Sequence, residues 1–240
     1  MGTNSSRTMP PPVILSNTAK QTATIIFLHG LGDTGHGWSS IFSPFRASHI
    51  KYVFPTAPTI PVTINAGFSM PAWFDLKSIS LQGPEDEEGI KSATEKIHQM
   101  IEYEESKGIP SNRIIIGGFS QGGALALYSA LRYKKTLAGI IAFSCWLPLH
   151  TNFPQDALGN MNTPMIQCHG DSDPIVPFEF GQLTSEYIKK FMSNTKFKIY
   201  PSMMHTFCEE ELKDTINFIN QYLPPVNESE DSESCQSTKK

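Results

Sequence analysis

The chain has 240 residues, of which 39% are hydrophobic and 18% charged, and its formal net charge is −4 at pH 7. This length and composition predict one large globular domain, and the charge offers no basic surface for nucleic acid. No apolar run approaches the roughly 20 residues of a membrane-spanning helix, and the N-terminus lacks a signal-peptide pattern. The four cysteines show no metal-binding spacing, so we expect a reduced, cytoplasmic protein with neither metal nor cofactor.

The two ends of the chain differ in composition from the middle. Residues 1–12 are polar and then proline-rich, which predicts a flexible leader. Residues 226–240 are acidic and rich in serine, which predicts a disordered tail. The start matches the pattern for N-myristoylation of Gly2, but we prefer the interpretation of a chance match in a flexible leader. We therefore expect one folded domain over residues 13–225.

The predicted domain begins with a buried strand and a glycine-rich loop. Residues 24–28 form a continuous apolar run, the pattern of a parallel strand buried on both faces. The loop 29–35 then spells G-x-G-x-x-G, but a dinucleotide site needs an acidic residue about 20 positions later. Residues 50–56 contain none, so we reject that interpretation. A glycine loop can instead aim a backbone N–H, here that of Leu31, at a developing negative charge.

Strands, loops and helices alternate in the next part of the chain. Residues 51–54 predict a strand, and the three prolines of residues 55–61 exclude regular structure there. An aromatic loop over residues 70–76 precedes a helix from about residue 85 to 107. Its acidic start suits the positive end of the helix dipole, which explains the acids better than metal binding does.

A strand, a sharp turn and a helix at the centre of the chain carry the clearest chemical signal. The apolar run 113–117 leads into Gly118-Phe119-Ser120-Gln121-Gly122, and residues 123–132 are rich in alanine and leucine. In this setting G-x-S-x-G predicts a nucleophile elbow, which exposes the serine hydroxyl on a tight turn. The backbone N–H of the following residue, Gln121, then points at the space in front of Ser120.

The alternation of strands and helices continues to the end of the domain. Because parallel strands need crossovers, which are usually helices, we predict an α/β fold with a mostly parallel sheet covered on both faces. About twenty residues separate two of the later strands, too few for a large lid domain. The later strands are predicted at residues 138–144, 165–169 and 197–200, and the later helices at residues 178–192 and up to about 223.

A serine nucleophile needs a base to take its proton, and the base needs an acid to orient it. In α/β-hydrolases these residues follow in the chain order Ser, Asp or Glu, His, each on a loop after a strand. Of the seven histidines, only His205 lies between the last predicted strand and the final helix. Two aspartates, Asp171 and Asp173, follow the preceding strand. Spacing leaves both open, since Asp171 could instead cap the turn.

Five motifs in one order carry a family resemblance, at residues 29–34, 118–124, 145–149, 167–177 and 203–205. Over about residues 12–225 the chain resembles the acyl-protein thioesterases, the lysophospholipase/carboxylesterase group of the α/β-hydrolase superfamily. The resemblance implies an α/β-hydrolase fold without a large lid domain. It also implies Ser120 as nucleophile, His205 as base and Asp173 as orienting acid, with the backbone N–H groups of Leu31 and Gln121 as oxyanion hole.

The resemblance further implies a substrate class. It predicts hydrolysis of thioester-linked fatty acyl (palmitoyl) groups on S-acylated proteins, with lysophospholipids or small esters as alternative substrates. A catalytically silent binding protein of the same fold is a third interpretation. The partners would be acylated proteins or lipids, met in transient contact with a membrane surface; the sequence does not indicate an oligomeric state.

Apolar loop residues near the predicted site could line a channel for the acyl chain. Each of them could also simply fill the edge of the core. The resemblance places the channel along the loop 76–81 and the segment after Asp173. The residues we expect to line it are Trp73, Leu76, Ile79, Trp146, Ile175, Val176 and Phe178.

Overall fold

The computed structural model describes residues 8–80 and 82–226. Most of the expected leader with Gly2, position 81 of the expected channel loop 76–81, and the expected tail after residue 226 lie outside the described residues. Within the described ranges, no helix is long and apolar enough to span a membrane. The same ranges contain no group of three His, Cys, Asp or Glu side chains that could hold a metal ion.

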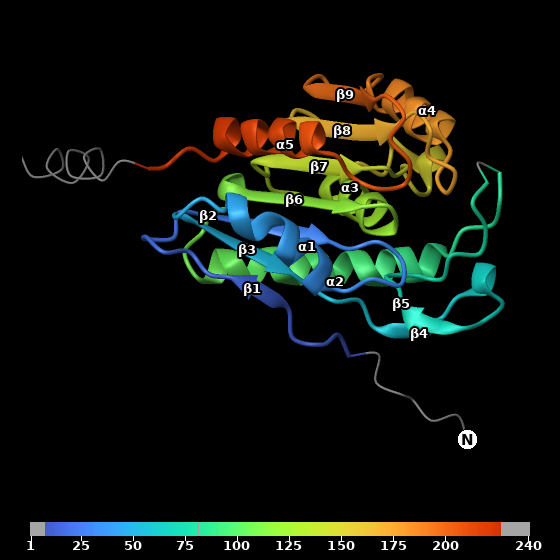
Figure 1. Cartoon of the computed structure of the whole chain (residues 1–240), viewed down its shortest axis with the longest axis horizontal. Coiled ribbons are helices and arrows are strands. Elements are labelled where there is room, and N and C mark those ends of the chain that lie inside the picture. Colours follow the sequence, from blue (N-terminus) through green and yellow to red (C-terminus); the bar gives the residue numbers. More distant parts are fainter. Residues whose placement is uncertain (1–7, 81, 227–240) are drawn as a thin grey trace, which may run out of the picture.

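A seven-stranded sheet forms the centre of the fold (Figure 1). Its strands are β1 (Val13–Leu15), β2 (Ala23–Leu28), β3 (Ile50–Phe54), β6 (Ile114–Phe119), β7 (Gly139–Phe143), β8 (Met165–Gly170) and β9 (Thr195–Tyr200). Their spatial order is β1-β3-β2-β6-β7-β8-β9. All neighbours are parallel except β1, which runs antiparallel to β3.

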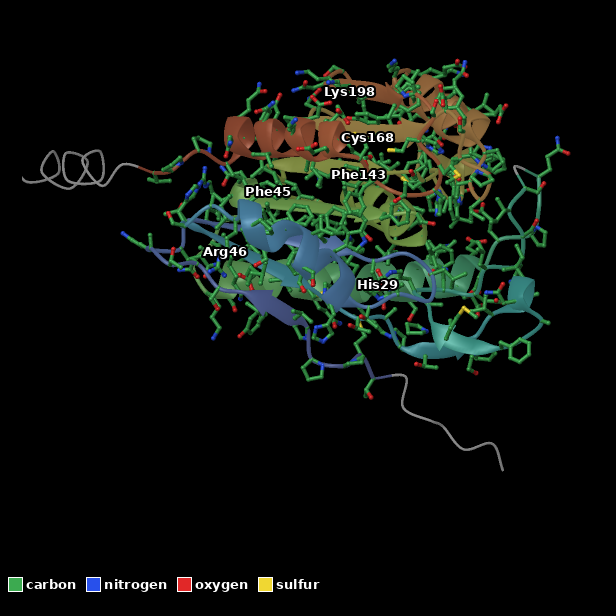
Figure 2. The ribbon with its side chains drawn as sticks, viewed as in Figure 1. His29, Phe45, Arg46, Phe143, Cys168 and Lys198 are labelled. Carbon is green, nitrogen blue, oxygen red and sulfur yellow. The ribbon has the colours of Figure 1, made fainter. Side chains whose placement is uncertain are left out.

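Helices cover both faces of this sheet, as the sequence predicts. Ile114 and Ile116 of β6 pack into one apolar cluster together with helices α2, α3 and α4, while Ile115 packs into the opposite cluster with α1 and α5. Phe143 and Cys168, labelled in Figure 2, belong to that second cluster. The helices are α1 (Gly35–Phe42), α2 (Glu87–Ser106), α3 (Gln121–Arg132), α4 (Phe178–Ile188) and α5 (Glu209–Tyr222).

The structure adds elements that the sequence patterns did not predict. Strand β1 and helix α1 are both short, and a small hairpin joins β4 (Thr59–Pro61) to β5 (Ser69–Pro71). The prediction that prolines exclude regular structure up to residue 61 is therefore wrong. Pro61 and Pro71 stand at the last positions of β4 and β5, where a missing N–H removes no interior hydrogen bond. Short 3₁₀ turns occur at Ser43–Phe45, Thr63–Asn65, Ser111–Arg113 and His150–Asn152.

The strands that carry the predicted chemistry end at one edge of the sheet. Gly118, near the end of β6, pairs with Leu28 at the end of β2, and Gly170 at the end of β8 pairs with Tyr200 at the end of β9. Because these strands are parallel, the loops after all four meet at the same edge. Between β7 and β8 the described chain holds one short 3₁₀ turn and no inserted domain.

Candidate active site

The turn between β6 and α3 has the geometry of a nucleophile elbow. Ser120 takes a positive φ of 55°, and its N–H donates to the Phe143 carbonyl (2.8 Å). A Cβ on Gly118 would lie 2.5 Å from the backbone of Gly122, and one on Gly122 would lie 2.4 Å from the Leu28 carbonyl. Glycine is therefore required at both positions for the strand and helix to approach this closely.

The structure brings the three predicted catalytic side chains together. The Ser120 hydroxyl lies 3.0 Å from His205 Nε2, and His205 Nδ1 lies 2.6 Å from Asp173 Oδ2. Since an ionised carboxylate only accepts, the assigned tautomer carries its proton on Nδ1 and leaves Nε2 free to accept from Ser120. The His205 ring also packs on Phe119, with ring centroids 4.6 Å apart. This arrangement can activate a serine for attack on a carbonyl carbon.

Asp173 is buried, yet its surroundings keep it ionised. It is only 6% exposed, and its Oδ1 accepts the backbone N–H groups of Ile175 and Val176, each at 2.9 Å. Burial alone raises the pKa of this carboxyl, but the hydrogen bonds from His205 and from the two backbone donors outweigh it. The pKa of Asp173 is therefore lowered, and its charge remains available to orient His205.

Asp171, the alternative acid, has a different place in the structure. Its Oδ1 accepts the Ser202 N–H (2.7 Å) and the Ser172 hydroxyl (2.9 Å). Ser202 adopts a left-handed φ of 60°, so Asp171 braces the strained turn that leads to His205. The capping role that spacing left open is the one that the structure gives to Asp171.

A second histidine lies beside Asp173, and in the sequence only its position at a strand end next to the acids indicates it. His169 is fully buried, and its Nε2–H donates to the Val176 carbonyl (2.9 Å). Its Nε2 is also 3.6 Å from Asp173 Oδ2. Burial lowers the pKa of His169, which keeps the ring neutral and leaves the Asp173 charge to His205.

The two residues expected to supply oxyanion donors both border the cavity that contains Ser120. Leu31, after β2, and Gln121, the first residue of α3, both line it. Within the described part of the chain, neither N–H makes a hydrogen bond; for Gln121 this is expected, because it is in the first turn of a helix. No acidic residue occupies the first turn of α3. Both donors are therefore free to bind an oxyanion.

Five of the residues expected to line an acyl channel do line the Ser120 cavity, and two do not. The cavity has a volume of about 370 Å³. Trp73 is instead buried, and its Nε1–H donates to the His29 carbonyl after β2. Phe178 stacks on Phe197, away from the cavity. The lining residues from that expectation are Leu76, Ile79, Trp146, Ile175 and Val176.

A second, mostly apolar cavity shares part of its lining with the first. It has a volume of about 380 Å³ and reaches Leu183 and Tyr187 on α4. Leu76, Ile79 and Trp146 line both cavities. The shared side chains show that the second cavity lies beside the one that contains Ser120.

Comparisons with known proteins place the chain in a family. A family model described as phospholipase/carboxylesterase matches residues 9–223. The chain belongs to this family. Acyl-protein thioesterase 1 of Neurospora crassa is 42% identical over 237 residues, which cover 93% of this chain and 96% of that protein. Acyl-protein thioesterase 1 of Gibberella zeae is also 42% identical, over 230 residues that cover 90% of this chain and 97% of that protein.

Solved structures of family members agree with the architecture described above. The crystal structure of Arabidopsis thaliana SOBER1 is 35% identical with a TM-score of 0.79, covering 84% of this chain and 99% of that one. That of Zea mays acyl-protein thioesterase 2 is 30% identical with a TM-score of 0.80, covering 88% and 98%. The α/β-hydrolase fold predicted from the five motifs is thereby confirmed.

Proposed function

We propose that this chain is a serine hydrolase that removes thioester-linked fatty acyl groups, palmitoyl in particular, from S-acylated cysteines of proteins. One arrangement carries the proposal, the Ser120 hydroxyl 3.0 Å from a His205 ring that Asp173 holds from the other side. Relatives named acyl-protein thioesterase 1, which match nearly the whole chain, support the substrate class. Residues 13–225 form the catalytic unit in this proposal.

The geometry supports a two-step acyl transfer to water. Ser120 attacks the thioester carbonyl while His205 Nε2 takes its proton, and the Leu31 and Gln121 N–H groups bind the resulting oxyanion. As the tetrahedral intermediate collapses, the thiolate leaves and takes the proton from His205. A water molecule, deprotonated by His205, then attacks the acyl-enzyme and releases the fatty acid and the free Ser120.

In this mechanism the acyl chain extends from the Ser120 cavity into the neighbouring one, which favours long chains. A chain bound to Ser120 would pass Leu76, Ile79 and Trp146, which line both cavities. Each buried methylene contributes about 0.8 kcal/mol of transfer free energy, so affinity should rise with chain length until the cavities are filled. Equal kcat/KM values for short and long chains would contradict this route.

The surroundings of the cavity suit a substrate that is anchored in a lipid surface. Ile175, which lines the cavity, is 52% exposed, and Met204, next to His205, is 59% exposed. Apolar side chains exposed together in this way fit transient contact with a membrane. The cysteines in the described ranges are all free thiols, which suits a reducing compartment such as the cytoplasm.

A single set of assays tests the proposal. The purified chain should cleave a palmitoylated peptide thioester, and Ser120→Ala should reduce kcat by at least about 10³-fold, because only binding and the oxyanion hole remain. Ser40→Ala, which removes a hydroxyl on helix α1 away from the cavity, is the matched control and should retain full activity. Near-normal turnover by Ser120→Ala would refute the assignment.

The family description also covers phospholipases and carboxylesterases, so a lysophospholipid should be assayed beside the thioester. A higher kcat/KM for the lysophospholipid would make lysophospholipase the main activity. Stoichiometric labelling of Ser120 by a fluorophosphonate distinguishes both activities from a silent binding protein, since labelling requires an activated serine. Absence of labelling would contradict every hydrolase interpretation.

A further inference from the structure

The two proposed oxyanion donors come from segments far apart in the sequence, and one residue bridges them. Leu31 follows His29 on the loop after β2, and Gln121 begins α3. Trp73, which follows the β4–β5 hairpin, contacts both segments. Its Nε1–H donates to the His29 carbonyl (2.8 Å), and its backbone N–H donates to Gln121 Oε1 (3.1 Å). In return, Gln121 Nε2 donates to the Phe74 carbonyl (2.8 Å).

This bridge is buried, and its polar groups are satisfied. Gln121 and His29 are fully buried and Trp73 is 5% exposed. Figure 2 labels His29, which directly follows the last residue of β2. Its Nδ1–H donates to the Gly30 carbonyl (2.6 Å), while Nε2 accepts the Ala57 N–H (3.0 Å). A buried network in which each member has partners holds its atoms in one arrangement.

An oxyanion hole works only when both donors reach the same point. Removing one donor typically slows an enzyme by about 10²–10³-fold, and a displacement of about 1 Å can cost about 10²-fold. The position of the Leu31 N–H depends on the loop after β2. Trp73 holds this loop through its hydrogen bond to His29. The Gln121 donor belongs to the residue whose side chain Trp73 and Phe74 hold. The spacing between the donors is therefore set through Trp73.

We propose that Trp73 is a positioning residue for the oxyanion hole, and that with the Gln121 side chain it fixes the distance between the Leu31 and Gln121 N–H groups. This inference rests on the proposed hydrolase function. It replaces the expectation that Trp73 contacts the acyl chain. The two roles differ in what they change: a positioning residue acts on the carbonyl of every substrate, whereas a channel residue acts on long chains only.

The variant Trp73→Phe removes the Nε1–H donor and keeps an aromatic ring. With acetyl and palmitoyl thioesters we expect kcat to fall by about 10–10²-fold for both substrates, with KM within about 3-fold of wild type. A trifluoromethyl ketone, whose adduct with Ser120 carries an oxyanion, should bind more weakly by a similar factor. All rates are divided by the fraction of enzyme that a fluorophosphonate finally labels, which removes the contribution of misfolded protein.

Trp38→Phe is the matched control. Trp38 on α1 is 4% exposed and packs on aromatic rings, including that of Phe119. Among the described contacts its indole N–H makes no hydrogen bond, so the substitution deletes the same atoms without breaking a bridge. Its kcat should stay within about 3-fold of wild type. If Trp73→Phe does not fold, Gln121→Met provides the test, because it removes both side-chain bonds at similar volume and should give the same loss of kcat.

Three results would overturn the inference: an unchanged kcat in Trp73→Phe or Gln121→Met, an equal loss in Trp38→Phe, or a KM increase confined to the palmitoyl substrate. The acetyl substrate separates this inference from the proposed function. If the wild type cleaves the acetyl thioester but not the palmitoyl one, the substrate proposal fails. The comparison of Trp73→Phe with Trp38→Phe on the acetyl thioester then still decides the role of Trp73.

Discussion

Two buried carboxyl groups near the His205 loop have pKa values shifted in opposite directions. Asp173, on the loop after β8, is 6% exposed, and Glu211, in the first turn of α5, is 0% exposed. Asp173 receives three hydrogen bonds, from the His205 ring and the N–H groups of Ile175 and Val176. In the described structure, neither carboxyl oxygen of Glu211 has a hydrogen-bonding partner of good geometry.

The difference in donors reverses the effect of burial. Burial raises the pKa of Glu211 to about 8, because the nearby Cys208 N–H offsets it only in part and the Asp214 charge adds to it. For Asp173 the donors outweigh burial, and the pKa is lowered. In this protein a buried carboxyl group therefore stays ionised only when hydrogen-bond donors point at it. Burial alone does not make it a catalytic anion. Glu211 should be neutral at pH 7 and contribute no charge.

The largest effect is expected at Asp173, which is the catalytic residue of the pair in the proposed function. Asp173→Asn keeps the shape but loses the charge, and its amide can donate to His205 Nδ1 and so place the ring proton on the wrong nitrogen. We expect kcat to fall by about 10³–10⁴-fold at neutral pH. Asp171→Asn, the same substitution two residues earlier, keeps its acceptor for the Ser202 N–H. It should leave kcat within about 3-fold; similar losses in both variants would reject the assignment of Asp173.

The second effect concerns stability and its dependence on pH. In the unfolded chain the Glu211 carboxyl ionises near pH 4.5, and in the folded chain only near pH 8. Between these values the unfolded state binds fewer protons, so the free energy of unfolding falls as the pH rises, and the loss is complete above about pH 8. Glu211→Gln removes this term. It should be more stable than wild type by on the order of 4 kcal/mol at pH 8, with kcat unchanged.

Urea unfolding of both proteins at several pH values between 4 and 9 measures this effect. Other titrating groups contribute equally to the two curves, so the difference between them isolates Glu211. That difference should be smallest at the acidic end and grow toward pH 8. Parallel curves would mean that Glu211 titrates normally and that the contrast with Asp173 is absent.

Local patterns were sufficient for the sheet and the nucleophile. Strands buried on both faces are continuous apolar runs, so β2, β6 and β8 could be read directly from the sequence. The elbow at Ser120 could also be predicted, because Gly118 and Gly122 are demanded by a close backbone approach that any sequence with this turn must satisfy. Such features depend on neighbours along the chain.

Features that depend on distant contacts could not be predicted in this way. Asp171 and Asp173 differ only in which backbone groups the folded loop presents to them, so spacing left both open. Trp73 has the composition of a channel residue, but its partners His29 and Gln121 lie more than forty positions away. The neutral state of Glu211 likewise depends on what surrounds α5 in space. The sequence contains these residues without showing which of them meet.

The smallest expected effect concerns Ser202, which lies between Asp173 and Glu211 in the chain. Ser202 holds a left-handed φ of 60°, a conformation that costs an L-residue roughly 1–2 kcal/mol and glycine almost nothing. Ser202→Gly should therefore match or exceed wild-type stability by up to about 0.5 kcal/mol, since relief of strain exceeds the entropy of glycine in the unfolded chain. Ser202→Val adds a β-branched side chain and should lose about 1 kcal/mol. Urea midpoints rank the three proteins, and if valine proved as stable as glycine, Asp171 would be bracing a turn that is not strained.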